Sequence, residues 1–160
     1  MKFIVVDAQG YSIPEFQVKE LAVYDGKQMK NYVFKSPIPF HALNEDHQKQ
    51  VLYLDGNLHG LFYGYGKTDY DEIYSILYNS LQDVDTIYVK GHGKKNFLEK
   101  TLSIMKYKLP KIVNLEFVSG DVPKLEKNNA ICDNHHVNFC KCSVSNAYIL
   151  YDYIVSLLPK

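Results

Sequence analysis

The sequence contains no arginine, so all 18 of its basic residues are lysines. Lysine is a compact charge and cannot form the planar, two-pronged hydrogen bonds with which arginine recognises guanine in the major groove. The chain also has no net charge at pH 7, because 18 acidic residues balance the lysines. No overall field therefore draws it toward nucleic acid or an anionic membrane. We expect no sequence-specific binding of duplex DNA.

Long apolar runs and a signal peptide are missing as well. The apolar segment Phe3–Val6 near the start is far shorter than the core of a signal peptide. No stretch approaches the roughly 20 apolar residues that span a bilayer. We expect an intracellular protein, cytoplasmic or nuclear, with no membrane partner. Thiols stay reduced in those compartments, so the three cysteines within residues 132–142 are expected to bind metal rather than to form disulfides.

The order of apolar patterns predicts a single α/β domain over residues 1–160. Apolar and β-branched runs predict strands at 2–10, 16–25, 28–35, 85–91 and 112–118. Helical spacing of apolar residues predicts helices at 43–54, 70–82, 94–105 and 143–158. Three consecutive strands followed by alternating helices and strands describe a mixed five-stranded sheet with helices on both faces.

Four short motifs follow one another along these elements. Asp7 lies at the end of the first apolar run, and His59-Gly60-Leu61 follows the first helix. Gly91-His92-Gly93-Lys94 follows the fourth strand, and His135 precedes Cys140 with four residues between them. This order of elements and motifs resembles the DEDDh exonucleases of the RNase H-like superfamily. The resemblance covers nearly the whole chain and implies an RNase H-like fold.

The catalytic carboxylates of that family are mostly missing. Such nucleases hold two divalent cations on four carboxylates. By the resemblance, those four positions correspond to Asp7, Gln9, Lys94 and Cys140, so one carboxylate remains. The charge of Lys94 would repel a cation, and a cysteine thiolate does not suit magnesium. We therefore expect a pseudo-nuclease without two-metal hydrolysis.

A second motif overlaps the degenerate site. Glu116, in the fifth predicted strand, is followed by Cys132, His135 and Cys140 in the spacing Cys-x2-His-x4-Cys. This set resembles the Glu-Cys-His-Cys signature of the Maelstrom domain, a branch of the same fold. The domain is named for a germline protein of the small-RNA pathway that silences transposons. The resemblance implies a structural zinc ion on Glu116, Cys132, His135 and Cys140.

The chemistry of zinc leaves some ligand choices open. Zinc takes four ligands in a tetrahedron, and a Cys-x2-His turn can direct both side chains at one ion. Cys142 is a rival of Glu116 for the fourth position, because zinc also accepts three thiolates and one imidazole. His136 is a less well-spaced rival of His135. The other interpretations are that the thiols are simply buried, or that Cys140 or Cys142 is a nucleophile with His135 as its base.

Aromatic residues alternate with glycine in the loop after the first predicted helix. Tyr63 and Tyr65 lie there beside Lys67, and aromatic rings next to lysine can stack on unpaired bases and contact the backbone. We expect RNA or a protein as the partner, in an RNA-linked process such as transposon silencing. Two alternatives stay open: a weak single-strand RNA endonuclease that does not use the two-metal mechanism, and a protein-interaction domain of a viral or mobile element.

Overall fold

Five strands form a mixed sheet in a computed structural model, which describes residues 2–105, 108, 110–118, 121–129, 132–137 and 139–159. They are β1 (Phe3–Ser12), β2 (Phe16–Tyr24), β3 (Met29–Val33), β4 (Thr86–Val89) and β5 (Lys111–Asn114), in the spatial order β3-β2-β1-β4-β5. β1 and β3 are antiparallel to β2, whereas β4 is parallel to β1 and β5 is parallel to β4. The predicted α/β class and mixed five-stranded sheet are confirmed, and the topology is consistent with an RNase H-like fold.

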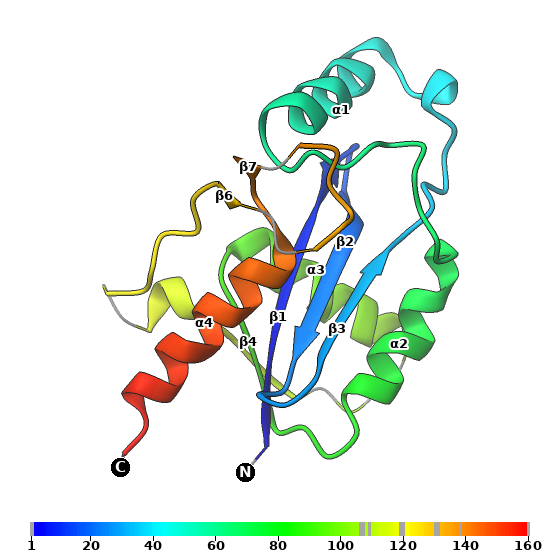
Figure 1. Ribbon diagram of the computed structural model, residues 1–160. Coiled ribbons are helices and arrows are strands. Elements are labelled where there is room, and N and C mark those ends of the chain that lie inside the picture. Colours follow the sequence, from blue (N-terminus) through cyan, green and yellow to red (C-terminus); the bar gives the residue numbers. More distant parts are fainter. Residues whose placement is uncertain are drawn as a thin grey trace.

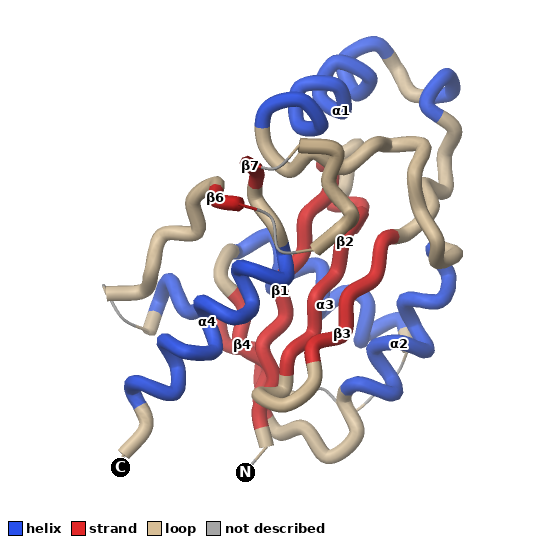
Figure 2. Tube along the Cα trace, in the orientation of Figure 1, coloured by secondary structure: helices blue, strands red, loops and turns tan. Residues whose placement is uncertain are grey.

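Helices cover both faces of this sheet (Figure 1; Figure 2). α2 (Ile73–Ser80) and α3 (His92–Ile104) lie on one face, α4 (Ser143–Leu157) lies on the other, and α1 (Glu45–Asn57) lies beyond one end of β1 and β2. The short strands β6 (Asn128–Asn129) and β7 (Phe139–Cys140) pair with each other. None of the helices within the described residues is long and apolar enough to cross a membrane.

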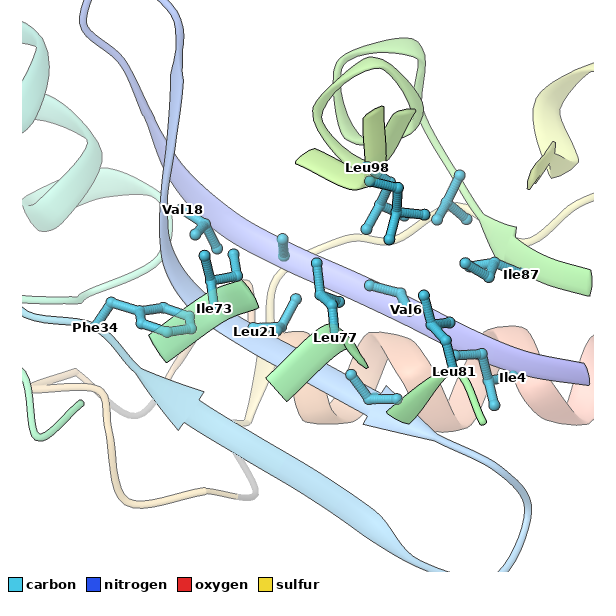
Figure 3. Close-up of a cluster of buried hydrophobic side chains, with 14 residues drawn as sticks. Ile4, Val6, Val18, Leu21, Phe34, Ile73, Leu77, Leu81, Ile87 and Leu98 are labelled. Atoms are coloured by element: carbon cyan, nitrogen blue, oxygen red, sulfur yellow. The ribbon is translucent and has the colours of Figure 1, made fainter. Parts of the chain in front are cut away.

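The alternation of side chains along the strands separates two buried layers. On one face, apolar side chains of the sheet such as Ile4, Val6 and Leu21 pack against α2 and α3 (Figure 3). The helices contribute Ile73, Leu77 and Leu98 to this layer. On the other face Val5 and Ala22 pack against α4. Because side chains two apart on a strand share a face, Asp7 and Glu20 also point toward α4. Two acidic side chains therefore lie in the layer between the sheet and α4.

Local capping fixes several boundaries. Asn44 precedes α1, and its side-chain oxygen accepts a hydrogen bond from the His47 N–H at 2.8 Å. The fifth strand is shorter than predicted, because the Asn114 side-chain oxygen accepts the Glu116 N–H at 3.1 Å and begins a 3-10 turn at Leu115–Phe117. Glu116 is therefore exposed and lies outside the sheet.

A bulge redirects the end of β1. The pairing register of β1 and β2 shifts between Gln9 and Gly10. The strands approach so closely there that a Cβ on Gly10 would lie 2.1 Å from the carbonyl oxygen of Gln17. Glycine is needed at this bend. Beyond it, Tyr11 packs against Val51 of α1, so the bulge brings the end of the sheet under that helix.

Candidate metal centre

Four potential metal ligands meet between β2 and the beginning of α4. Glu20 lies on β2, Cys132 and His135 lie between β6 and β7, and Cys142 immediately precedes α4. One ligand atom of each residue lies within 4.8 Å of the other three. The Sγ atom of Cys132 is 3.2 Å from Glu20 Oε2 and 3.5 Å from the Sγ atom of Cys142. The Nε2 atom of His135 is 3.3 Å from the same Glu20 oxygen.

These separations suit a tetrahedral ion. Zinc–ligand bonds of about 2.0–2.3 Å place neighbouring ligand atoms roughly 3.3–3.8 Å apart, close to the observed distances. The side chains of His135 and Glu20 are fully buried. His135 Nε2 has no hydrogen-bond partner within the described part of the chain, since its approach to Glu20 lacks hydrogen-bond geometry. A buried polar atom without a partner is costly. The group could therefore hold a metal ion.

Surrounding groups fix the orientation of the ligands. The Nδ1–H of His135 donates to the carbonyl oxygen of His59 and leaves Nε2 directed at the other three ligands. The two Glu20 oxygens accept hydrogen bonds from the Ser143 N–H and from the Asn134 amide, each at 2.9 Å. Ser143 is the first residue of α4, so the acidic ligands lie at the positive end of that helix dipole.

In the metal-free chain a proton supplies the positive charge of the centre. Burial disfavours a charged His135, but its polar contacts with Cys142 and Glu20 outweigh burial and raise its pKa to about 10. Burial would raise the pKa of Glu20, but His135, Asn134 and Ser143 together lower it to about 2. The contact between the sulfurs of Cys132 and Cys142 lowers the pKa of the Cys142 thiol and raises that of the Cys132 thiol. A bound cation would displace the remaining protons.

Three of the residues that the sequence singles out belong to this group: Cys132, His135 and Cys142. Glu116 and Cys140 do not belong to it. Glu116 is exposed in the turn after β5. Cys140 is fully buried in β7, and burial raises the pKa of its thiol to about 11. The carboxylate and the second sulfur of the group therefore come from Glu20 and Cys142.

Glu20 is the ligand that sequence analysis misses. It precedes Cys132 by 112 residues and lies inside the apolar strand FQVKELAVY. A signal is present, because Lys19 and Glu20 interrupt a run whose neighbours are apolar. Both are fully buried, and a buried charge requires a partner. Adjacent side chains of a strand face opposite sides of the sheet. Lys19 and Glu20 therefore indicate one buried polar contact on each face.

Two of the four positions that the nuclease resemblance implies, Asp7 and Gln9, lie on β1 beside the candidate metal centre. Gln9 on β1 is the pairing partner of Glu20 on β2. Asp7 is fully buried, and its Oδ1 atom contacts the ammonium group of Lys94 at 2.5 Å. Its Oδ2 atom accepts a hydrogen bond from the side chain of Asn146 on α4 at 3.0 Å. Lys94 therefore neutralises the one carboxylate that remains.

The side chain that donates to the second oxygen of Asp7 comes from Asn146 on α4. Cys140 makes no hydrogen bond to Asp7 in the described structure, whereas Asn146 does. Cys140 lies in β7, before α4 begins, and its backbone pairs with Asn128. Asn146 lies one turn into α4 and faces the sheet, where it is 1% exposed. The neutral amide of Asn146 adds no charge next to Asp7.

The tyrosine-rich loop also differs from the expectation. Tyr63 is 7% exposed; its ring packs edge-on against Tyr11, and its hydroxyl donates to the carbonyl of Ile38. Its faces are therefore not open to a base. Tyr65 is half-buried and Lys67 is exposed.

The exposed ring of this loop belongs to Phe62, which is 52% exposed. It stacks on the imidazole of His136 with a centroid distance of 3.9 Å and an interplanar angle of 17°. His136 Nε2 contacts the carboxylate of Asp55 on α1. His136 is thus engaged away from the metal group, which leaves His135 as the imidazole ligand.

A tight turn at His59–Leu61 connects this loop to the metal centre. The buried His59 accepts the Leu61 N–H at its Nδ1 atom, at 3.1 Å. Gly60 has a φ of 62°, and its carbonyl oxygen accepts the His136 N–H at 2.8 Å. A Cβ on Gly60 would lie 2.5 Å from Val137 Cγ2. Glycine is therefore required where the turn meets the cysteine-containing loop.

Removing the ammonium group of Lys94 should destabilise the fold, because the buried Asp7 carboxylate loses its positive partner. We expect Lys94→Met to lower the free energy of unfolding by roughly 2–4 kcal/mol, because a buried charge is left without a partner. The double variant Asp7→Asn/Lys94→Met should recover much of this loss, because it removes both charges. Lys95→Met is the control, since the Lys95–Glu99 pair is solvent-exposed and such pairs contribute little. Urea unfolding measures all four proteins. Equal losses for Lys94→Met and Lys95→Met would contradict the assignment.

His59 should make stability fall in mild acid. Burial, and next the charge of His135, lower its pKa from 6.5 to about 4. Between those two values the unfolded chain binds a proton that the folded chain does not, so stability falls as the pH falls through this window. The expected loss from pH 6 to pH 5 is about 1 kcal/mol. His59→Asn keeps an acceptor for the Leu61 N–H but does not titrate, so its unfolding free energy should change less over that interval. Parallel pH profiles for the two proteins would reject this role.

No known family model, curated protein or solved structure matches the chain. The site is therefore interpreted from its own residues and geometry.

Proposed function

We propose that this chain is a zinc-stabilised, catalytically degenerate RNase H-like domain, similar to the Maelstrom domain, that binds single-stranded RNA. The observation that carries the proposal is the group of Glu20, Cys132, His135 and Cys142, whose ligand atoms all lie within 4.8 Å of one another. Two sulfurs, one imidazole and one carboxylate at tetrahedral separations suit zinc, whereas magnesium and calcium prefer oxygen ligands. The composition of the set is that of the Maelstrom signature, although its members differ from those first expected.

The role proposed for zinc is structural. Four protein ligands complete a tetrahedron and leave no position for water or substrate. The ligands come from β2, from the segment between β6 and β7 and from the residue before α4. An ion at this point would join three segments that are distant in sequence, and its binding free energy would add to that of folding.

The absence of nuclease chemistry is supported by the contacts of Asp7. Two-metal hydrolysis needs several carboxylates around a pair of cations. Here the carboxylate of Asp7 is paired with Lys94, and its other oxygen accepts from the amide of Asn146. A cation would have to displace an ammonium group at 2.5 Å. These contacts of Asp7 oppose a two-metal site independently of the missing acids.

RNA binding follows from the Maelstrom resemblance and gains support from the loop after α1. Phe62 offers an exposed aromatic ring, and Lys67 is exposed a few residues further on. An exposed ring beside lysine favours a single strand, whose unpaired bases can stack. The lack of arginine argues against recognition of duplex DNA by base edges.

Zinc content tests the metal proposal directly. Elemental mass spectrometry of untagged protein should give about one zinc per chain, as one tetrahedral site requires. Cys132→Ser, Cys142→Ser and Glu20→Gln should lose most of the metal and melt at lower temperature. Glu116→Gln and Cys140→Ser should keep it, because neither side chain belongs to the group.

The two sets of variants distinguish the possible ligand sets. Loss of zinc from Glu116→Gln or Cys140→Ser, with Glu20→Gln still loaded, would restore the ligands first expected from the spacing. A parent chain purified without any metal, and unchanged by added zinc, would refute the zinc site altogether.

Binding of labelled RNA tests the second part of the proposal. We expect the chain to shift single-stranded RNA at low salt with an affinity on the order of micromolar that weakens as salt rises, as phosphate contacts require. Duplex DNA should shift less, and the RNA should remain intact with or without magnesium. No shift of any RNA would reject RNA as the partner and favour a protein-interaction domain.

A weak RNA endonuclease is the second candidate, and the His136–Asp55 pair is the observation that favours it. An imidazole held by a carboxylate can act as a general base toward a ribose hydroxyl. In that case cleavage in the RNA assay would survive purification and persist in Asp7→Asn, but be lost in His136→Gln. Cleavage that declines with each purification step would exclude this candidate.

A further inference from the structure

A cavity of about 610 Å³ lies between α1 and the two loops that flank it in sequence. Its lining is largely apolar and comes from residues 35–40, from α1 and from residues 62–64, including Ile38, Phe40, Leu52 and Phe62. In Figure 1 the segment after β3 rises on the right of α1, and the loop after α1 passes beneath that helix. Concave sites of this size with a few polar groups are typical of small ligands.

One wall of the cavity is a flat ring that is held from behind. Phe62 lines the cavity and stacks on His136, which does not line it. His136 is fixed by the carboxylate of Asp55 and by its N–H bond to Gly60. His136 covers one face of the Phe62 ring, so the other parts of the side chain account for its 52% exposure. A planar group entering the cavity can therefore stack on a ring whose position is already set.

An acceptor lies beside that ring. Asp55 also lines the cavity, and its side chain is 15% exposed. Its Oδ1 atom contacts His136, while its Oδ2 atom accepts no hydrogen bond from the described residues. A carboxylate oxygen at the edge of a stacked base would accept from an exocyclic amino group. Adenine, cytosine and guanine carry such a group, and uracil does not.

Two lysines lie near the entrance. Lys35 lines the cavity, and its ion pair with Asp69 is exposed on both sides, so it contributes little and can yield to another anion. Gly66 packs against the backbone of Lys35, where an added Cβ would lie 2.5 Å from its nitrogen. Lys67 is therefore close to Lys35 along this rim. Phosphates flanking a bound base would meet these two positive charges.

We propose that this cavity receives one unpaired base of single-stranded RNA, stacked on Phe62 and hydrogen-bonded through an exocyclic amino group to Asp55. The inference deepens the proposed RNA binding and rests on it. An apolar peptide side chain fits less well, because it would bring Asp55 out of water without a donor. A stacked base satisfies both the ring and the carboxylate.

Fluorescence anisotropy with short labelled homopolymers of A, C and U tests the assignment on the zinc-loaded protein. The parent chain should prefer the A and C strands over the U strand. Phe62→Ala should weaken binding of the A and C strands on the order of tenfold, the effect of removing one stacked base, and Phe62→Tyr should restore it. Asp55→Asn should reduce the preference for A and C over U. Tyr53→Ala is the matched control, since Tyr53 is 65% exposed on α1 and does not line the cavity.

Each outcome decides a different claim. RNA binding that is unchanged in Phe62→Ala overturns the base site and leaves the proposed RNA-binding function standing. A parent chain that binds no RNA overturns both. Equal weakening by Tyr53→Ala would also overturn the base site, because it would indicate a diffuse aromatic surface.

A second measurement keeps the assignment testable should Phe62→Ala fail to fold. Titration of the parent protein with cytidine monophosphate should shift the backbone amide signals of Phe62 and Gly64 in NMR spectra. Uridine monophosphate should shift them less. Shifts confined to other parts of the chain, with RNA still bound, would overturn the base site.

Discussion

Two buried carboxylates, Asp7 and Glu20, determine how the rest of this domain is arranged. Both are fully buried on the face of the sheet that α4 covers. A buried carboxylate needs a positive partner, because its desolvation costs several kcal/mol. The two are satisfied differently. Lys94 neutralises Asp7, whereas Glu20 lies among the imidazole of His135 and two thiols.

These two solutions differ in the source of the positive charge that each carboxylate receives. For Asp7 on β1, the ammonium group of Lys94 supplies the positive charge, so this carboxylate needs no metal ion. On β2 the charge comes from a proton on His135 or from a metal ion. Gln9 and Glu20 are paired across the two strands, so the metal centre lies directly beside the degenerate site. The group that could hold a metal ion combines one carboxylate with one imidazole and two thiols.

Much of the fold and three of the four residues of the candidate centre could be singled out from the sequence, for a local physical reason. Strand and helix periodicities need only neighbouring residues, and Cys132, His135 and Cys142 lie within one short segment. Glu20 could not be found this way, because its partners are more than a hundred residues distant. Glu116 is the carboxylate that the Maelstrom resemblance implies, but the Asn114 side chain ends the fifth strand before it and Glu116 is exposed.

The tyrosine loop illustrates the same limit. Composition favours Tyr63 and Tyr65 as the rings that contact RNA. Which ring of this loop is exposed depends, however, on which side chains the turn directs into the core. Tyr63 is held by its hydroxyl bond to Ile38, and the adjacent Phe62 is left outside. The turn at His59–Leu61 sets this choice. The carbonyl of His59 accepts from the metal ligand His135, and the carbonyl of Gly60 accepts from His136. His135 and His136 are adjacent, so these two hydrogen bonds to the turn at His59–Leu61 connect the candidate metal centre with the imidazole that stacks on Phe62.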